Sequence, residues 1–278
     1  RRPPRSTLDR SSAASDVYKR QPEDVSQGIA AADELEKQIL EEGADTVAMF
    51  IAEPVQGAGG VIVPQEDYFK RIREICDQYE VLLVADEVIT GFGRTGKMFG
   101  LEHWGIEPDL MQFAKAITSG YFPLGGIGIS DEIASVMNDS GSPWMHAYTY
   151  SSHPVGCAVA LAMMDIIENE DFVGQAQTKG KHLLVKLKEA LADHPHVGEV
   201  RGLGMMCGVE LVKNKATKEM FDASDGVGAK VHAETVKRGM FSRVRGDCYC
   251  VAPPIVTSES TIDDIASILG DSVKAVLG

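Results

Sequence analysis

The order of apolar and amphipathic segments constrains this chain more than any other feature. Short apolar runs occupy 46–52, 81–85 and 109–114, and amphipathic helical patterns precede the first two, at 29–43 and 66–79. Short apolar runs are typical of buried strands, and strands that alternate with helices favour a mostly parallel sheet covered by helices. With a further strand expected at 125–129, the pattern predicts an α/β domain.

The second half of the chain has a different character. The expected elements are long helices at 153–168 and 171–192, a strand at 203–212, a helix at 227–238, a strand ending at Val251 and a helix at 262–276. This succession predicts a smaller α+β lobe. The predicted limits are 22–165 for the α/β domain, 166–195 for a connecting helical region and 196–278 for the C-terminal domain.

Composition excludes several classes of protein. The formal net charge of −14 over 278 residues disfavours nucleic acid and anionic membranes as partners. No apolar run approaches the roughly 20 residues that a membrane helix needs. The five cysteines include no C-x-x-C pair, and Cys248 and Cys250 are spaced too closely for an ordinary disulfide within a strand. We expect a protein of the reducing cytoplasm.

The first 21 residues do not resemble the rest of the chain. They carry six basic and two acidic residues, a bias that also occurs in organelle transit peptides, but they lack an amphipathic apolar face. The codons of a standard transposase-based sequencing adapter translate to the residues found at 11–21, SSAASDVYKRQ. We therefore expect 1–21 to be a non-native, adapter-derived tail, and 22–278 to be a fragment of a longer protein.

Three polar residues follow the apolar runs directly. Glu53, Asp86 and Lys115 each stand where a predicted strand ends. Ligands of open α/β sheets collect at the carboxyl ends of the strands. A lysine there can form a Schiff base, and a carboxylate can hold the proton of a pyridine nitrogen. Two other interpretations explain the same residue types. The lysine and a carboxylate can form a buried salt bridge, or each polar residue can simply be the first solvated position after a strand.

Longer motifs make a family resemblance visible. The stretches EPVQGAGGVIVP (53–64), ADEVITGFGRTG (85–96), FAKAITSGY (113–121) and YTYSSHPVGCAVALA (148–162) resemble the class III, fold-type I aminotransferases, which depend on pyridoxal 5'-phosphate. The similarity extends from about residue 22 to the end and is closest to ω-amino acid and amine:pyruvate transaminases. It implies a partial fold-type I large domain followed by a small C-terminal domain.

The resemblance also assigns roles to the residues that hold the cofactor. Lys115 matches the lysine that forms the Schiff base with pyridoxal phosphate, and Asp86 matches the carboxylate bonded to the pyridine nitrogen. Val88 matches the side chain packed against one face of the ring. Glu53 matches a glutamate near the cofactor that helps to position Asp86. Thr149 matches the threonine that reaches the cofactor phosphate of the neighbouring subunit, which implies a homodimer with shared sites.

Substrate recognition is implied at a single position. Arg243 precedes the APP strand, where the family has a mobile arginine that binds the substrate carboxylate, and Arg245 is its rival by proximity. The expected reaction moves an amino group from an ω-amino acid or amine to a keto acid such as pyruvate. The alternatives are an aminomutase of the glutamate-semialdehyde kind, a diaminopelargonate-type transaminase, and a non-catalytic gene fragment.

Two departures from the family's motifs qualify the resemblance, and one glycine-rich stretch must be distinguished from a nucleotide-binding motif. Ser152 replaces the glycine of the family's SGHP motif, at a cost of roughly 1 kcal/mol if that position needs a positive φ. The family's phosphate-binding Gly-Ser/Ala loop and its ring-stacking aromatic residue are not found in this sequence, so we expect the fragment to bind cofactor poorly. The GFGRTG stretch (91–96) lacks the spacing of a nucleotide-binding fingerprint.

Overall fold

The first half of the chain folds as alternating helices and strands. The computed structural model describes residues 26–141 and 148–278, so the expected adapter-derived tail lies outside the described residues. The elements of this half are α2 (Gln27–Glu42), β1 (Met49–Ala52), α3 (Tyr68–Gln78), β2 (Leu82–Asp86), β3 (Leu110–Phe113), β4 (Gly126–Ile129) and α4 (Asp131–Asp139). The prediction of an α/β arrangement with a mostly parallel sheet is confirmed.

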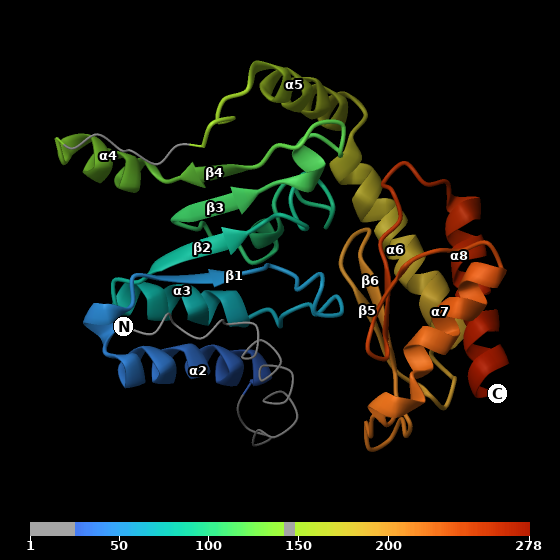
Figure 1. Ribbon diagram of the computed structural model, residues 1–278. Coiled ribbons are helices and arrows are strands. Elements are labelled where there is room, and N and C mark those ends of the chain that lie inside the picture. The colour runs from blue at the N-terminus through green and yellow to red at the C-terminus, as the bar shows by residue number, and fades with distance from the viewer. Residues whose placement is uncertain (1–25, 142–147) are drawn as a thin grey trace.

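The first sheet brings three strand ends to one edge. Its strand order is β1-β2-β3-β4, in which the pairs β1–β2 and β2–β3 are parallel and β4 is antiparallel to β3. Ala52 lies opposite Ala85, and Asp86 lies opposite Gln112. Figure 1 shows the arrowheads of β1, β2 and β3 all pointing toward the second half of the molecule.

Helices α2 and α3 cover one face of this sheet. Ile39 of α2, Ile72 of α3 and Leu83 of β2 belong to one hydrophobic cluster and are at most 1% exposed. Side chains alternate between the two faces of a strand, and on the other face of β1 Met49 is 53% exposed and Ile51 45% exposed. The opposite face of β1 therefore presents apolar surface to solvent.

The second half of the chain consists of helices and a second sheet, an α+β arrangement as expected. Its elements are α5 (Pro154–Asn169), α6 (Phe172–Leu191), β5 (Val197–Gly202), β6 (Cys207–Leu211), α7 (Val227–Lys237), β7 (Arg243–Arg245), β8 (Cys248–Val251) and α8 (Glu259–Leu277). The second sheet has the order β5-β6-β8-β7 and is antiparallel throughout. Leu187 of α6, Val209 of β6, Tyr249 of β8 and Leu269 of α8 share its core. The predicted domain limits stay a prediction.

Some boundaries differ from expectation for local reasons. The strand predicted at 203–212 begins only at Cys207, because 203–206 form a tight turn in which Gly204 has a φ of 57°. Helix α4 and strands β5 and β7 were not predicted. Strand β5 (VGEVRG) contains two glycines and two charges, and β7 is only three residues long, so neither shows an apolar run. No helix within 26–141 or 148–278 is long and apolar enough to cross a membrane.

Candidate active site

The sheet topology gathers the three predicted strand-end residues. Glu53 directly follows β1, Asp86 ends β2, and Lys115 lies two residues beyond β3. The three strands are parallel and adjacent, so these residues emerge at the same sheet edge. The charges of Asp86 and Lys115 both act on the Glu53 carboxyl, which places the three groups in one electrostatic cluster.

Glu53 is a half-buried carboxyl with a fixed orientation. The Gly57 N–H donates a 2.8 Å hydrogen bond to its Oε2 atom. Burial raises the pKa of Glu53, and the nearby charge of Asp86 raises it further, while the Gly57 hydrogen bond and the charges of Lys115 and Arg245 oppose the rise. The carboxyl thus holds its proton more tightly than an exposed glutamate does.

Asp86 is held by the turn that follows β2. Its Oδ1 atom accepts a 3.1 Å hydrogen bond from the N–H of Val88. In the described part of the chain no other hydrogen bond reaches this carboxylate, so its second oxygen is open to a further donor. Val88 is half-buried beside it.

Lys115 has an unusual backbone conformation. It begins a short 3₁₀ helix (Lys115–Ile117) with a φ of 44°, in the left-handed region. A residue with a Cβ atom pays roughly 1–2 kcal/mol for this conformation. Its side chain is exposed among the described residues. Strained backbone tends to occur at functional positions, which supports a special role for this lysine.

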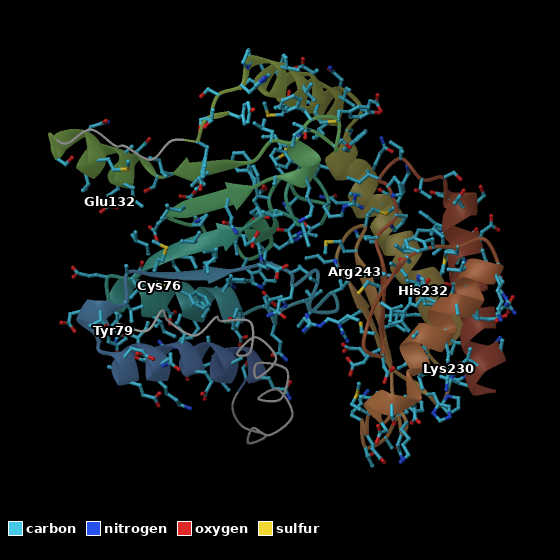
Figure 2. The ribbon with its side chains drawn as sticks, in the orientation of Figure 1. Cys76, Tyr79, Glu132, Lys230, His232 and Arg243 are labelled. Atoms are coloured by element: carbon cyan, nitrogen blue, oxygen red, sulfur yellow. The ribbon has the colours of Figure 1, made fainter. Side chains whose placement is uncertain are left out.

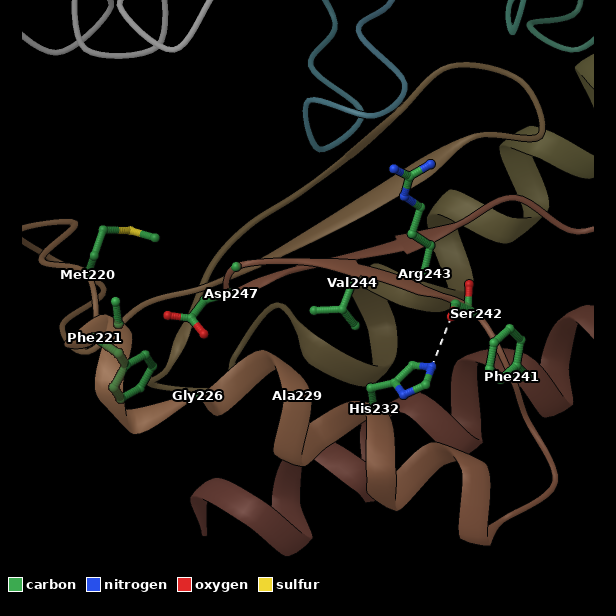
Figure 3. Close-up of a pocket in the computed structure, with 12 residues that line it drawn as sticks. Met220, Phe221, Gly226, Ala229, His232, Phe241, Ser242, Arg243, Val244 and Asp247 are labelled. Atoms are coloured by element: carbon green, nitrogen blue, oxygen red, sulfur yellow. Dashed lines mark hydrogen bonds between the residues drawn. The ribbon is translucent and has the colours of Figure 1, made fainter. Parts of the chain in front are cut away.

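The two arginines predicted as rivals for a substrate carboxylate lie on one face of β7. Arg243 and Arg245 alternate with Val244, whose side chain points the other way, and Figure 3 shows Arg243 pointing away from His232. Arg245 Nη1 donates a 3.0 Å hydrogen bond to Ala58 O in the loop after Glu53. Arg243 makes no hydrogen bond or ion pair within the described segments. In Figure 2 it lies on the side of the second sheet that faces the first sheet.

Thr149 does not join this cluster within the structure. It lies in an exposed turn before α5, and no contact joins it to Glu53, Asp86 or Lys115 among the described residues. The role expected for it is in the site of a neighbouring subunit, and this stays a prediction. Ser152 in the same segment has a φ of 57°, so the position does adopt the left-handed conformation that favours glycine.

Sequence reasoning missed a buried carboxylate next to Asp86. Glu87 is fully buried and accepts hydrogen bonds from Gly100 N at 2.8 Å, Leu101 N at 3.0 Å and the Thr90 hydroxyl. Burial raises its pKa despite these bonds. Glu87 thereby ties the glycine-rich segment to the end of β2. A charge within an otherwise apolar and glycine-rich stretch was the only available signal.

Two arginines that were not predicted from the sequence join the two halves of the molecule. Arg94 is half-buried, and its Nη1 atom donates to the carbonyl oxygens of Pro253 at 2.6 Å and Met205 at 3.3 Å. Arg201 of β5 donates to Val61 O at 3.0 Å and Gly60 O at 2.8 Å. Both guanidinium groups hold the second sheet against loops of the first.

A surface cavity in the second half of the chain is separate from the cluster of Glu53, Asp86 and Lys115. A cavity of about 900 Å³ opens beside α7 and β7 (Figure 3). Its lining includes Phe221, His232, Phe241 and Arg243, and His232 Nε2 lies 2.9 Å from Ser242 O. All of its lining residues fall within 220–247, so Glu53, Asp86 and Lys115 do not contribute to it. We therefore assign the candidate site to the sheet edge.

Comparisons with known proteins identify the family to which this chain is similar. The family model for class-III aminotransferases matches residues 9–273, and its match begins within the segment interpreted as a tail. The chain is 48% identical over 254 residues to a putrescine–pyruvate aminotransferase of Pseudomonas aeruginosa, covering 90% of this chain and 55% of that protein. It is 45% identical to a probable mitochondrial gamma-aminobutyrate transaminase of Oryza sativa subsp. indica, covering 87% of this chain and 48% of that protein.

Solved structures show the same relationship. An (S)-enantioselective ω-transaminase from Thermomicrobium roseum superposes with a TM-score of 0.86 at 46% identity, over 91% of this chain and 56% of that one. A transaminase from the marine bacterium Virgibacillus superposes with a TM-score of 0.87 at 44% identity, over 90% of this chain and 57% of that one. The chain spans about half the length of the curated relatives that it matches. By sequence and by fold, the chain belongs to the class-III aminotransferase family.

Proposed function

We propose that this chain is part of a transaminase that uses pyridoxal 5'-phosphate and moves an amino group from an amine or ω-amino acid to a keto acid such as pyruvate. The convergence of Glu53, Asp86 and Lys115 at one sheet edge is the observation that carries the proposal. The similarity to a putrescine–pyruvate aminotransferase and to an ω-transaminase supports this choice of donor and acceptor.

The residues at the sheet edge fit the cofactor. An aldehyde needs a primary amine, which Lys115 presents in an exposed position. A protonated pyridine nitrogen needs a fixed carboxylate, and Asp86 has one oxygen bonded to Val88 N and the other open. When bound, pyridoxal phosphate supplies an electron sink for the negative charge that develops on the substrate carbon.

The chain's own residues then divide the remaining tasks. Lys115 Nζ, once free, takes the proton from the substrate carbon that carries the amino group. Asp86 keeps the ring nitrogen protonated, and Glu53, anchored by Gly57 N, lies beside Asp86 and limits the movement of its carboxylate.

A carboxylate-bearing substrate also needs a cation. Arg245 is engaged with Ala58 O, whereas Arg243 makes no hydrogen bond or ion pair within the described residues. We therefore assign the carboxylate of the keto acid to Arg243, whose planar guanidinium suits two parallel hydrogen bonds.

We further propose that two copies of the full protein associate and share their sites. Helix α5 exposes Val155 by 53%, Leu161 by 60% and Ile166 by 42%. Exposed apolar side chains on one helix are characteristic of a surface that another subunit covers. Thr149 lies just before this helix, where it can reach a cofactor phosphate in the second copy.

Trapping the cofactor on its lysine tests the proposal. The full-length protein that contains this chain is mixed with pyridoxal phosphate and borohydride, digested, and mapped by mass spectrometry, and alanine formation from putrescine and pyruvate is followed in parallel. We expect the reduced cofactor on Lys115 and expect Lys115→Arg to lose both signals, because arginine keeps the charge but forms no imine.

Surface lysines provide the control for this experiment. Lys230 is exposed on α7, on the outer side of the second half (Figure 2), and Lys230→Arg should leave both signals unchanged. Cofactor spread over surface lysines with none on Lys115 would refute the proposed site. Cofactor on Lys115 without alanine formation would instead refute the proposed donor and acceptor.

A further inference from the structure

The loop after β1 forms a closed turn beside Glu53. Gln56 and Ile62 exchange backbone hydrogen bonds of 3.0 and 3.1 Å, which close the base of the turn. Residues 57–61, which lie between them, are named the glycine turn. The N–H of Gly57 donates the 2.8 Å hydrogen bond that orients the Glu53 carboxyl. A movement of the glycine turn therefore reaches Glu53 through Gly57.

The glycine turn is strained at its last residue. Val61 has a φ of 54°, in the left-handed region, where a β-branched side chain is rarely found. The N–H groups of Gly60 and Val61 both donate to Gly57 O, at 3.2 and 3.3 Å, so the strained residue and the residue that binds Glu53 belong to one hydrogen-bonded unit. Strain of this kind persists only where the surrounding contacts hold it in place.

Arg201 supplies such contacts from the second sheet. Its Nη2 atom donates to Gly60 O at 2.8 Å and its Nε atom to Val61 O at 3.0 Å, so one guanidinium holds two consecutive carbonyl groups. Its Nη1 atom binds the carboxylates of Glu199 and Glu210, at 2.8 and 2.6 Å. The side chain of Arg201 is 14% exposed. The guanidinium is therefore fixed to the second sheet on one side and to the glycine turn on the other.

The backbone of the second sheet also lies close to the glycine turn. In Figure 1 the loop after β1 extends toward β5 and β6. A Cβ atom at Gly208 of β6 would lie 2.7 Å from Gly60 O, and Cys248 Sγ of β8 donates to the same oxygen at 3.3 Å. Bonds from a charged donor are the stronger kind, so Arg201 makes the main connection between this sheet and the turn.

We propose that Arg201 is a positioning residue for Glu53, which it holds through the glycine turn. In the described part of the chain, no hydrogen bond or ion pair joins Arg201 to any of the three strand-end residues, so its effect runs through the backbone. When Arg201 is replaced, Val61 leaves its strained conformation, the N–H of Gly57 moves, and the Glu53 carboxyl loses its fixed orientation. The inference rests on the proposed function, in which Glu53 limits the movement of Asp86.

Hydrogen–deuterium exchange of the full-length protein that contains this chain tests the hold on the turn. Arg201→Lys keeps the positive charge beside Glu199 and Glu210, but one ammonium cannot reproduce the fork that binds two carbonyl groups. We expect the amides of 54–63 to exchange about tenfold faster in this variant, because the turn opens more easily, while the amides of α3 keep their rate. Far-ultraviolet circular dichroism verifies that the variant is folded.

Arg94 provides the matched control for this experiment. It also joins the two halves of the molecule, but it binds the carbonyl oxygens of Pro253 and Met205 instead of the glycine turn. Arg94→Lys should therefore leave the exchange of 54–63 unchanged. If Arg201→Lys leaves this exchange unchanged, or if Arg94→Lys raises it equally, Arg201 has no specific hold on the turn and the proposal is wrong.

A double-mutant cycle tests whether the effect reaches Glu53. The kcat of alanine formation from putrescine and pyruvate is measured for Arg201→Lys alone and in a Glu53→Ala background. We expect a loss of about tenfold in the first case and of less than about twofold in the second, because the turn then has no carboxyl left to orient. Equal losses in the two backgrounds would show that Arg201 does not act through Glu53.

The two measurements also separate this inference from the proposed function. If the full-length protein forms no alanine, the proposed donor and acceptor are wrong. The exchange of 54–63 requires no activity, so it still supports or overturns the hold of Arg201 on the glycine turn.

Discussion

The left-handed backbone conformation of Lys115 predicts that two substitutions of this residue differ in stability although both abolish function. Its φ of 44° costs a residue with a Cβ atom roughly 1–2 kcal/mol, a cost that glycine avoids. Glycine in turn loses roughly 0.5–1 kcal/mol more conformational entropy on folding than alanine does. The net of the two terms favours glycine, so Lys115→Gly should be about 1 kcal/mol more stable than Lys115→Ala.

The comparison between these two variants isolates the backbone. Both remove the amine and its charge next to Glu53, so any electrostatic change is common to them. Unfolding in urea, followed by far-ultraviolet circular dichroism, measures the difference in the free energy of unfolding. Over a chain of this size, about 1 kcal/mol corresponds to a shift of roughly 2–4 °C in the melting temperature. Neither variant should trap cofactor.

The neighbouring residue provides the control with the opposite sign. Ala116 has no positive φ, so Ala116→Gly should lower the free energy of unfolding by roughly 0.5–1 kcal/mol. If Lys115→Gly is less stable than Lys115→Ala by a similar amount, Lys115 does not adopt the left-handed conformation in solution. Backbone strain then gives no reason to regard this lysine as functional.

Two further predictions concern residues outside the candidate site. Ser152 has a φ of 57°, so Ser152→Gly should raise the free energy of unfolding by about 1 kcal/mol, while Ser152→Ala, which keeps the Cβ atom, should give no such gain in urea unfolding. Burial lowers the pKa of His103, whose Nε2 atom lies 3.1 Å from Thr95 O, so the folded state binds its proton less readily than the unfolded chain. The free energy of unfolding should therefore be at its full value above about pH 6.5 and should fall as the pH drops below that value toward the lower pKa of the folded state. In His103→Gln, the free energy of unfolding should change less with pH over this range.

The strands of the first sheet and the residues at their ends were predictable from local patterns. The predicted strands are mostly apolar, so the end of each is visible where Glu53, Asp86 or Lys115 interrupts the run. The parallel topology then requires these three ends to meet, although they are far apart in the sequence. This part of the site depends only on strand order.

The hydrogen bonds that hold the surroundings of those residues in place were not predictable, because they join residues that are far apart in the sequence. Arg94 donates to the carbonyl oxygens of Met205 and Pro253, and both of these residues lie more than a hundred positions away from it in the sequence. The buried carboxylate of Glu87 is compensated by backbone N–H groups that any residue could supply. Hydrogen bonds to backbone atoms leave no pattern of residue types, so sequence reasoning has no signal for them.

The glycine-rich segment 91–100 shows how a motif can serve packing rather than ligand binding. A Cβ atom at Gly96 would lie 2.8 Å from Cγ of Gln177, and one at Gly204 would lie 2.3 Å from the carbonyl carbon of Thr95. Both approaches are too close for a side chain. Glycine at these two positions therefore allows the backbone of the segment to lie directly against α6 and the turn before β6.

The backbone of this segment is also already engaged. Arg94 O accepts a 3.0 Å hydrogen bond from Met205 N, and Gly96 O accepts a 2.7 Å hydrogen bond from Gln177 Nε2. Gly96 N donates to Gly93 O at 2.9 Å and so is not free to bind a phosphate. The segment instead fixes the second sheet against the ends of β1, β2 and β3. That contact determines how far Arg243 lies from Lys115, and therefore, in the reaction that we propose, the length of substrate that spans the two.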